Sequence, residues 1–179
     1  YQLIIVYLII VSVPVYLSLN IQFRHLNYDN KITIIIEESG FQSILGQNFY
    51  SLPTTIYING ILQDTIYDRY ELGQGINNIT MIWDYLIESC SDMFSGLSNI
   101  TEIDLSNFDS SRVTATNNMF DSCRSLTSIN FENFKTELVT DMSEMFADCD
   151  SLESLDLSGF STSNTREMSR MFANCGSLT

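Results

Sequence analysis

The amino-acid sequence predicts an α/β fold, a right-handed solenoid of stacked strand-and-helix units that is preceded by a β-rich cap. The dipeptide Met-Phe recurs in steps of 26 residues, from Met93-Phe94 to Met171-Phe172. A unit of that length can hold one strand and one short helix but cannot bury both alone, so neighbouring units have to stack. Ahead of the repeats, β-branched runs alternate with turn residues without a period, which is typical of short strands.

The first 22 residues are expected to be a signal peptide or a membrane anchor. No charged side chain precedes Arg24, and the uncharged run has roughly the length that a membrane-spanning helix needs. A buried pair of strands is the alternative, because Ile, Val and Tyr also favour strands. Either of the first two outcomes sends the protein through the secretory pathway, so the expected localisation is extracellular or at the cell surface.

Residues 23–86 are expected to form the β-rich N-terminal cap. Strands are predicted at Ile32–Ile36, Thr54–Ile58 and Ile79–Trp83, three short runs rich in β-branched residues. Asn59-Gly60 separates the second run from Ile61-Leu62 and predicts a type I′ hairpin, because both turn residues tolerate a positive φ. Stacked repeats expose a terminal core, so the expected role of this region is to cover the first unit.

Residues 87–179 are expected to form about 3.5 repeat units. Many apolar positions keep the period, which makes a chance origin untenable and predicts a continuous core. The columns are Ile100, Leu126, Leu152 and Leu178; Ile103, Ile129 and Leu155; Leu105, Phe131 and Leu157; Phe108, Phe134 and Phe160; and Ile87, Val113 and Val139.

Two patterns within one unit predict its shape. Apolar residues across Leu126–Phe131 lie on one face of a short extended segment, while polar residues point the other way. Across Val139–Cys149 the apolar residues follow at steps of three and four, which predicts one stripe of a short helix. Thr136 or Thr140 is the expected start of that helix.

The repeats resemble a known family. The segments Leu105–Ser111, Val139–Leu152 and Leu155–Ser163 read LSNFDSS, VTDMSEMFADCDSL and LDLSGFSTS, and they are similar to the repeat of BspA-like leucine-rich-repeat surface proteins of bacteria and protists. The resemblance covers residues 87–179. It implies an extracellular or cell-surface protein that is used in adhesion or recognition and is not an enzyme. Thr116 and the segment Thr165–Glu167 depart from the family pattern.

The composition argues against two classes of function. The chain has 22 acidic and 8 basic residues and a formal net charge of −14, so it repels a phosphate backbone and nucleic acid is not an expected partner. Its single histidine, His25, gives little support to His-based catalysis or to a zinc site. We therefore expect no enzymatic activity, no metal ion and no cofactor.

The best candidate for a binding surface is the outward side of the repeat strands, which we call the polar face. Its small polar and acidic side chains form three stacked rows that suit a protein or glycan ligand on a concave surface. Their oxygen atoms also suit Ca²⁺, although no loop shows the spaced acidic pattern of a dedicated calcium site. An ordinary solvated sheet face is the alternative. The polar face consists of Glu102, Asp104, Ser106, Ser128, Asn130, Glu132, Ser154, Asp156 and Ser158.

Cysteines form a further column at Cys123, Cys149 and Cys175, for which we expect a ladder of buried free thiols. Parallel stacking spreads the thiols instead of converging them, which disfavours a metal site. Cys90 stands outside the column, and its disulfide status stays open.

Two Asn-x-Thr sequons, at Asn78 and Asn99, are predicted glycosylation sites in a secreted chain. Asn99 is expected at the flank of the first repeat strand, where a glycan requires an asparagine that faces solvent.

The leading hypothesis is a secreted or cell-surface protein whose non-catalytic solenoid mediates adhesion or recognition of a surface protein or glycan. The alternative is a structural subunit of an extracellular filament or coat, assembled by stacking of repeats or by donation of an apolar strand from residues 1–19. Self-association would accompany the second function. Contact with a membrane is expected only through residues 1–22.

Overall fold

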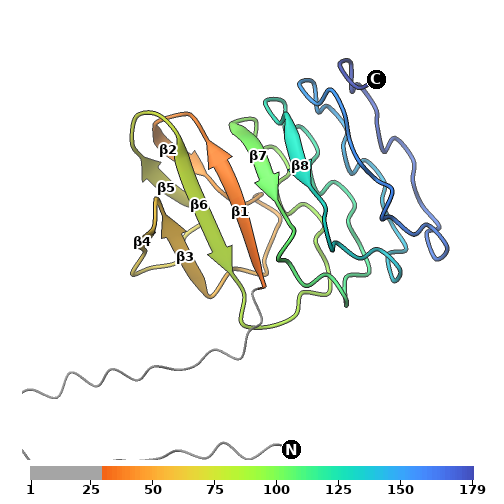
Figure 1. Cartoon of the computed structure of the whole chain (residues 1–179), viewed down its shortest axis with the longest axis horizontal. Helices are drawn as coiled ribbons and strands as arrows, with labels where there is room; N and C mark the ends of the chain where they lie inside the picture. The colour runs from red at the N-terminus through yellow and green to blue at the C-terminus, as the bar shows by residue number, and fades with distance from the viewer. Residues whose placement is uncertain (1–29) are drawn as a thin grey trace, which may run out of the picture.

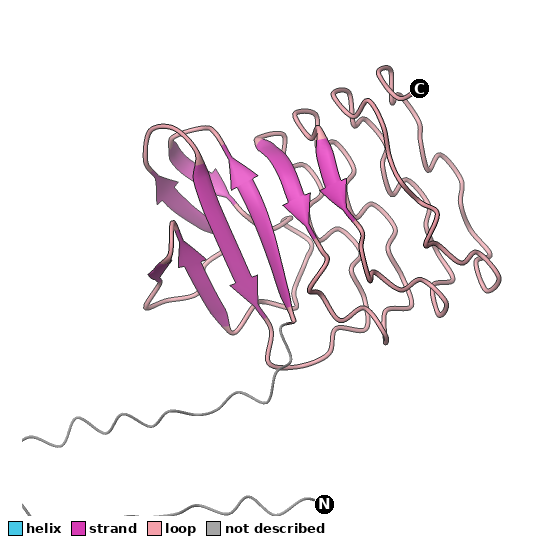
Figure 2. Ribbon diagram, viewed as in Figure 1, coloured by secondary structure: helices cyan, strands magenta, loops and turns pink. Residues whose placement is uncertain are grey.

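The computed structural model describes residues 30–179, so the signal peptide or anchor predicted at residues 1–22 lies outside the described residues. Every regular element in the described part is a strand, and most of the repeat region consists of turns (Figure 2). The strands are β1 (Lys31–Ile36), β2 (Gly40–Ser43), β3 (Thr55–Ile58), β4 (Ile61–Leu62), β5 (Arg69–Leu72), β6 (Asn77–Ile82), β7 (Ile100–Asp104) and β8 (Ser128–Asn130).

One six-stranded sheet joins the cap to the repeats. Its strand order is β4-β3-β6-β1-β7-β8, and a smaller sheet pairs β2 with β5. β1 runs antiparallel to both β6 and β7, whereas β7 and β8 are parallel, so β1 is the seam between the cap and the first repeat unit (Figure 1). Ile32, Ile34 and Ile36 alternate along β1 and are fully buried, which fixes the face that β1 turns to the core.

The hairpin and the three strands predicted in the cap are confirmed. β3 and β4 pair antiparallel on either side of Asn59 and Gly60, whose φ angles are 51° and 79°. A type I′ turn requires positive φ at both positions. The side chain of Asn59 also accepts a hydrogen bond from the backbone N–H of Asn78 at 2.8 Å, which ties the turn to β6.

The smaller sheet does not follow from the sequence pattern. β2 contains a single large apolar residue, Phe41, and its side chain is exposed. β5 does alternate, because Tyr70 and Leu72 are buried between exposed charged residues. Its two apolar positions make a weak signal beside the longer β-branched runs, so the pairing of β2 with β5 emerges only in the folded structure.

Successive repeat units lie side by side beyond the cap (Figure 1). The backbone N–H of Phe94 donates to the carbonyl oxygen of Met119 at 2.9 Å, and the equivalent bond recurs one and two units later. The ring of Phe120 stacks between those of Phe94 and Phe146, with centroid distances of 5.9 Å and 5.4 Å. Hydrogen bonds and aromatic stacking therefore both run across the units.

The helix predicted in each unit is wrong, since residues 30–179 contain no helix. Two positions in every unit adopt a left-handed backbone conformation, and a right-handed helix cannot continue through such a residue. Spacings of three and four fit a chain of tight turns as well as a helix, and here the N–H groups bond to the next unit. The first left-handed position recurs at Asp92, Asn118, Glu144 and Arg170, and the second at Gly96, Ser122, Asp148 and Asn174.

Thr136 and Thr140 connect neighbouring units instead of starting a helix. The Thr136 hydroxyl donates to the carbonyl oxygen of Ser161 at 3.1 Å and accepts from the Ser161 N–H at 2.8 Å. The Thr140 hydroxyl donates to the carbonyl oxygen of Thr114 at 3.2 Å. Threonine side chains thus serve the stacking of units at both positions.

Two residues fasten the cap to the first unit. The buried amide of Asn30 donates to the carbonyl oxygen of Tyr85 at 2.8 Å and accepts from the N–H of Asp109 at 3.0 Å. The N–H of Gly46 donates to the carbonyl oxygen of Met93 at 2.8 Å. Cap and repeats therefore share side-chain and main-chain hydrogen bonds in addition to the common sheet.

Candidate functional site

The structure aligns the first two rows of the polar face. In the parallel pairing of β7 with β8, Glu102 lies beside Ser128 and Asp104 lies beside Asn130. The third row, residues 154–158, follows in the next unit without a regular strand. All members of the polar face are exposed except residues 104 and 106, which are half-buried.

The middle column of the polar face shapes the backbone. The side chain of Asp104 accepts a hydrogen bond at 3.0 Å from the N–H two residues along the chain, and Asn130 and Asp156 make the same bond at 3.0 Å and 2.9 Å. Each bond closes an Asx turn where the strand segment ends. In Asp156, the hydrogen bonds from the hydroxyl and N–H of Ser158 hold the pKa of the carboxyl below its usual value. These oxygens are therefore already engaged by the protein.

Replacing Asn130 by alanine is expected to lower the free energy of unfolding by about 0.5–1.5 kcal/mol, because the Asx-turn hydrogen bond is lost. Asn130→Asp should be close to neutral, since aspartate fills the same column in both neighbouring units. Ser128→Ala, at the exposed start of β8, is the matched control. Denaturant unfolding measures all three, and an Asn130→Ala variant as stable as the control would contradict the structural role.

Part of the polar face lines a groove of about 440 Å³. It is bounded by side chains from residues 129–137 and 156–160. Asn130, Glu132, Asp156 and Ser158 of the polar face take part, and the other five members do not line it. Three phenylalanines, Phe131, Phe134 and Phe160, are among the lining residues, and the rings of Phe134 and Phe160 both pack against that of Phe131.

The groove lies where one unit departs from its neighbours. Four columns of the repeat change in the middle unit. They are Leu105, Phe131 and Leu157; Ser106, Glu132 and Ser158; Asp109, Lys135 and Ser161; and Ser111, Glu137 and Ser163. The middle unit thus carries a phenylalanine where its neighbours carry leucine, glutamates at two columns that hold serine in both neighbours, and a lysine at a column that holds Asp109 in one neighbour and Ser161 in the other. The three charged side chains are exposed and the stacking of units does not require them, whereas the half-buried ring of Phe131 packs against core phenylalanines of its own and the next unit.

The polar-face pattern alone misses Phe131, Lys135 and Glu137. The sequence signal that finds them is the difference between units: a column comparison marks the positions where one unit breaks the repeat. Only the structure shows that the broken columns converge on a single groove.

The charged groups of the groove have no ion-pair partner among the described residues. The ion pairs of that part join Arg124 to Asp150 at 4.0 Å and Arg170 to Glu144 at 3.6 Å, both at exposed positions. Lys135 lies close enough to Asp109 to contribute to the lowered pKa of that carboxyl, although hydrogen bonding from Ser111 is the main cause. The groove therefore offers charges that a ligand can pair.

Within residues 30–179, no three His, Cys, Asp or Glu side chains come together in a geometry that could hold a metal ion. The hypothesis that the polar face binds Ca²⁺ is therefore not supported by a preformed site in the described part. His25 lies outside that part.

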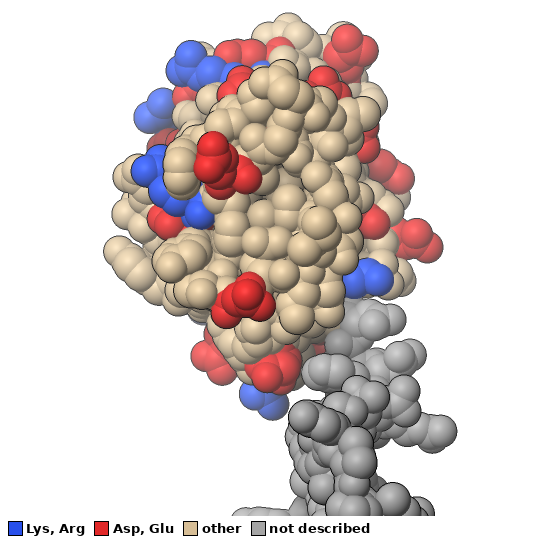
Figure 3. All heavy atoms as spheres, turned by 90° about the vertical axis from the view of Figure 1, so that its left-hand side faces the viewer, with Lys and Arg blue, Asp and Glu red and all other residues tan. Residues whose placement is uncertain are grey.

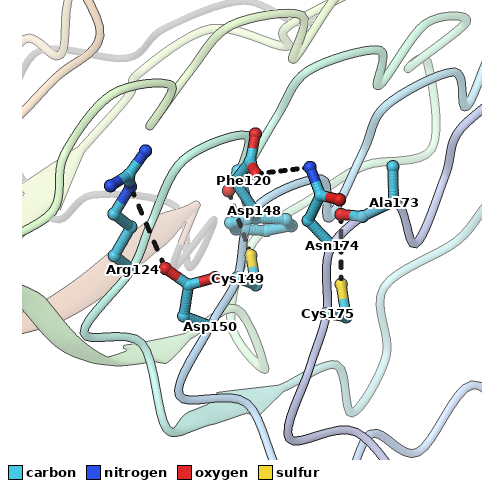
Figure 4. Close-up of polar contacts among 8 residues, drawn as sticks. All are labelled: Phe120, Arg124, Asp148, Cys149, Asp150, Ala173, Asn174 and Cys175. Carbon is cyan, nitrogen blue, oxygen red and sulfur yellow. Dashed lines mark hydrogen bonds and ion pairs between the residues drawn. The ribbon is translucent and has the colours of Figure 1, made fainter.

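The cysteine column donates hydrogen bonds across the units. The Cys149 thiol donates to the carbonyl oxygen of Phe120 at 3.2 Å (Figure 4), and Cys123 and Cys175 make the equivalent bond to the preceding unit at 3.2 Å and 2.9 Å. All four cysteines of the chain are free thiols, including Cys90, which is fully buried. Burial raises the pKa of the Cys149 thiol to about 12 and raises those of the other three as well.

Alkylation of the native protein is expected to modify Cys175 well before Cys90, Cys123 and Cys149. Cys175 is only half-buried, whereas the other three thiols lack access to solvent and are held protonated by burial. Iodoacetamide at pH 8 followed by peptide mass spectrometry gives the order of modification, with the denatured chain as the control. Equal rates at Cys123 and Cys175 would contradict a closed thiol ladder.

The two sequons differ in accessibility. Asn78 is exposed on β6 and remains a predicted glycosylation site. Asn99 is only 8% exposed, and its amide nitrogen donates to the side-chain oxygen of Gln42 at 2.9 Å. A glycan on that nitrogen is incompatible with this packing, so the prediction for Asn99 is wrong in the folded chain.

The described residues contain no helix with the length and apolar character needed to cross a membrane. The family model described as "Mycoplasma protein of unknown function, DUF285" matches residues 88–179. No curated protein and no solved structure is similar to the chain.

Proposed function

The chain belongs to the DUF285 family, and from that premise we propose that it is a BspA-like leucine-rich-repeat protein that recognises a partner at the cell surface or outside the cell. In this proposal residues 87–179 form a right-handed solenoid and residues 1–22 direct the chain to the secretory pathway. The function is recognition and not catalysis.

The groove between residues 129–137 and 156–160 is the observation that carries the proposal. A repeat array needs only its core columns and its cross-unit hydrogen bonds to stay folded. Glu132, Lys135 and Glu137 break surface columns of the repeat, Phe131 breaks a core column of leucines, and all four line one groove. A concave site lined by aromatic side chains and a few polar groups is a common form of ligand site.

Restoring the repeat in the groove is expected to abolish recognition without unfolding the protein. The variant Phe131→Leu, Glu132→Ser, Lys135→Ser and Glu137→Ser gives the middle unit the residues of the unit that follows it. We call it the repeat-restored variant. Each replacement already occurs in a stacked unit of this chain, so the change in unfolding free energy should stay within about 1.5 kcal/mol.

Binding of the full chain to a glycan array and to a phage-displayed peptide library measures recognition. The control variant Glu88→Ser, Glu153→Ser and Arg166→Ser removes the same charges at exposed positions that do not line the groove. Surface protease shaving of cells that produce the chain tests its location. Identical binding by wild type and the repeat-restored variant, or a chain found only inside cells, would sink the proposal.

A second candidate function, a self-assembling structural subunit, is favoured by the apolar surface of the cap. Few charged side chains interrupt the centre of this end of the molecule (Figure 3). β4 is the edge strand at the cap end of the six-stranded sheet, and both of its side chains are exposed. An exposed apolar edge strand is a template for pairing with another chain. The exposed large apolar residues of the cap are Phe41, Tyr50, Leu52, Ile61, Leu62, Tyr67, Ile76 and Tyr85.

Light scattering and electron microscopy of the full chain separate the two functions. Filaments or sheets that disappear in the variant Ile61→Lys and Leu62→Lys would favour the subunit. Monomers that bind a ligand through the groove favour recognition.

A further inference from the structure

The lining of the groove combines acidic side chains with phenylalanines. Glu132 and Glu137 contribute two carboxylates to its lining, Asp156 contributes a third whose Oδ1 already accepts the N–H of Ser158, and Lys135 contributes the one basic side chain. None of the four takes part in an ion pair of the described residues. The half-buried ring of Phe131 also lines the groove and packs against that of Phe160 with a centroid distance of 4.9 Å.

We propose that this groove binds an extended segment of a partner protein through an arginine side chain of that segment. The inference rests on the proposed function and adds the chemical class of the ligand. A guanidinium group is planar and weakly hydrated, stacks on aromatic rings, and pairs with two carboxylates through its fork of donors. The groove offers both kinds of contact within one concavity.

The charge of the whole chain favours the same ligand. A formal net charge of −14 attracts a cationic segment from a distance and raises its rate of encounter. A neutral glycan, by contrast, would cover the carboxylates of the groove without supplying a counter-charge, and the desolvation of unpaired charges is unfavourable.

Lys135 adds selectivity. An ammonium group among the carboxylates repels a second cation, so the groove selects a segment with one arginine beside apolar or acidic residues over a polybasic run. In the neighbouring units the same column holds Asp109 and Ser161, which lack this repulsion.

Panning a phage-displayed random peptide library on the full chain, with counter-selection on the repeat-restored variant, identifies what the groove prefers. Enriched peptides are expected to carry a single arginine next to an apolar residue. Replacing that arginine by citrulline, which keeps the shape and removes the charge, should weaken binding several-fold, up to about 10-fold. Isothermal titration calorimetry measures the pair of peptides, and higher ionic strength should reduce the difference.

A charge-reversed variant, Glu132→Lys and Glu137→Lys, is expected to lose its affinity for the arginine peptide. Its control, Glu88→Lys and Glu153→Lys, changes the net charge equally at exposed positions that do not line the groove and should keep binding. Circular dichroism and thermal unfolding of both variants show that the fold persists. Equal loss in both would overturn a site in the groove and reduce the effect to net charge.

The remaining outcomes separate the ligand class from the function. Enrichment of neutral or acidic peptides, or capture of a neutral glycan that the repeat-restored variant fails to bind, would overturn the arginine ligand and leave recognition through the groove intact. If no peptide and no glycan distinguishes wild type from the repeat-restored variant, the ligand class and the proposed function both fail.

Discussion

Replacement of Phe120 by alanine is expected to lower the free energy of unfolding by about 3–5 kcal/mol. The Phe120 ring is fully buried between the rings of Phe94 and Phe146 and also meets the edge of Phe131 at a centroid distance of 5.9 Å. Its removal leaves a cavity in the middle of the stack and breaks aromatic contacts on both sides. Chemical denaturation monitored by circular dichroism measures the effect.

Phe172→Ala is the matched control for that experiment. Phe172 belongs to the same column and stacks on Phe146 with a centroid distance of 5.5 Å, but its side chain is 41% exposed. The loss should be well below that of Phe120→Ala, because the site is partly solvated and no closed cavity forms. Equal losses at the two positions would show that the stack does not form the core of the repeats.

Replacement of Gly46 by alanine is expected to destabilise the junction between the cap and the repeats by about 3 kcal/mol or more. A Cβ atom at this position would collide with the backbone carbonyl oxygen of Asp92 and would approach the backbone nitrogen of Ser95 to 3.1 Å. Both atoms belong to main chain that is hydrogen-bonded to the next unit, and such a backbone cannot yield as a flexible side chain would. The N–H of Gly46 is itself bonded to the carbonyl oxygen of Met93.

Gly159→Ala provides the comparison, because nothing lies within 4 Å of the Cβ position there. This variant should match or slightly exceed the stability of wild type, since alanine restricts the unfolded chain. Thermal unfolding of both variants decides the matter. If the Gly46→Ala and Gly159→Ala proteins have the same melting temperature, the cap does not pack on the first unit as described.

Local signals in the sequence were sufficient to predict the backbone conformation wherever a few neighbouring residues determine it. Asn59-Gly60 specifies its hairpin because both residues accept a positive φ, and the β-branched run of β1 specifies a strand with one buried face. The period likewise predicts which side chains contact one another across the units. The stacked rings of Phe94, Phe120 and Phe146 are an example.

The same local signals gave a wrong prediction where one apolar pattern is compatible with two backbone conformations. Apolar steps of three and four between Val139 and Cys149 suit a helix, yet left-handed residues at Glu144 and Asp148 break it into turns. Such conformations cost energy for residues other than glycine, and hydrogen bonds to the neighbouring unit offset that cost. A single unit considered alone cannot reveal this choice, because the bonds that decide it belong to two units.

The candidate site shows the same division. The polar face and its rows follow from alternation along the strands, but the Asx turns at Asp104, Asn130 and Asp156 engage atoms that the pattern alone would offer to a ligand. The groove depends on the convergence of residues 129–137 with residues 156–160, which belong to consecutive units. The spacing of residues in the sequence predicts which residues share a column, but it does not predict where the surface between the columns is concave.

By itself, the sequence determined the 26-residue period, the identity of the core columns, the cap hairpin and the acidic character of the molecule. The tertiary structure alone decided that turns replace helices, that β1 joins the cap to the repeats, that Asn99 is buried and that four unit-breaking residues line one groove. The physical reason is the range of the interactions. Side-chain periodicity and turn propensity are local, whereas sideways hydrogen bonds, burial and concavity arise only between segments that folding brings together.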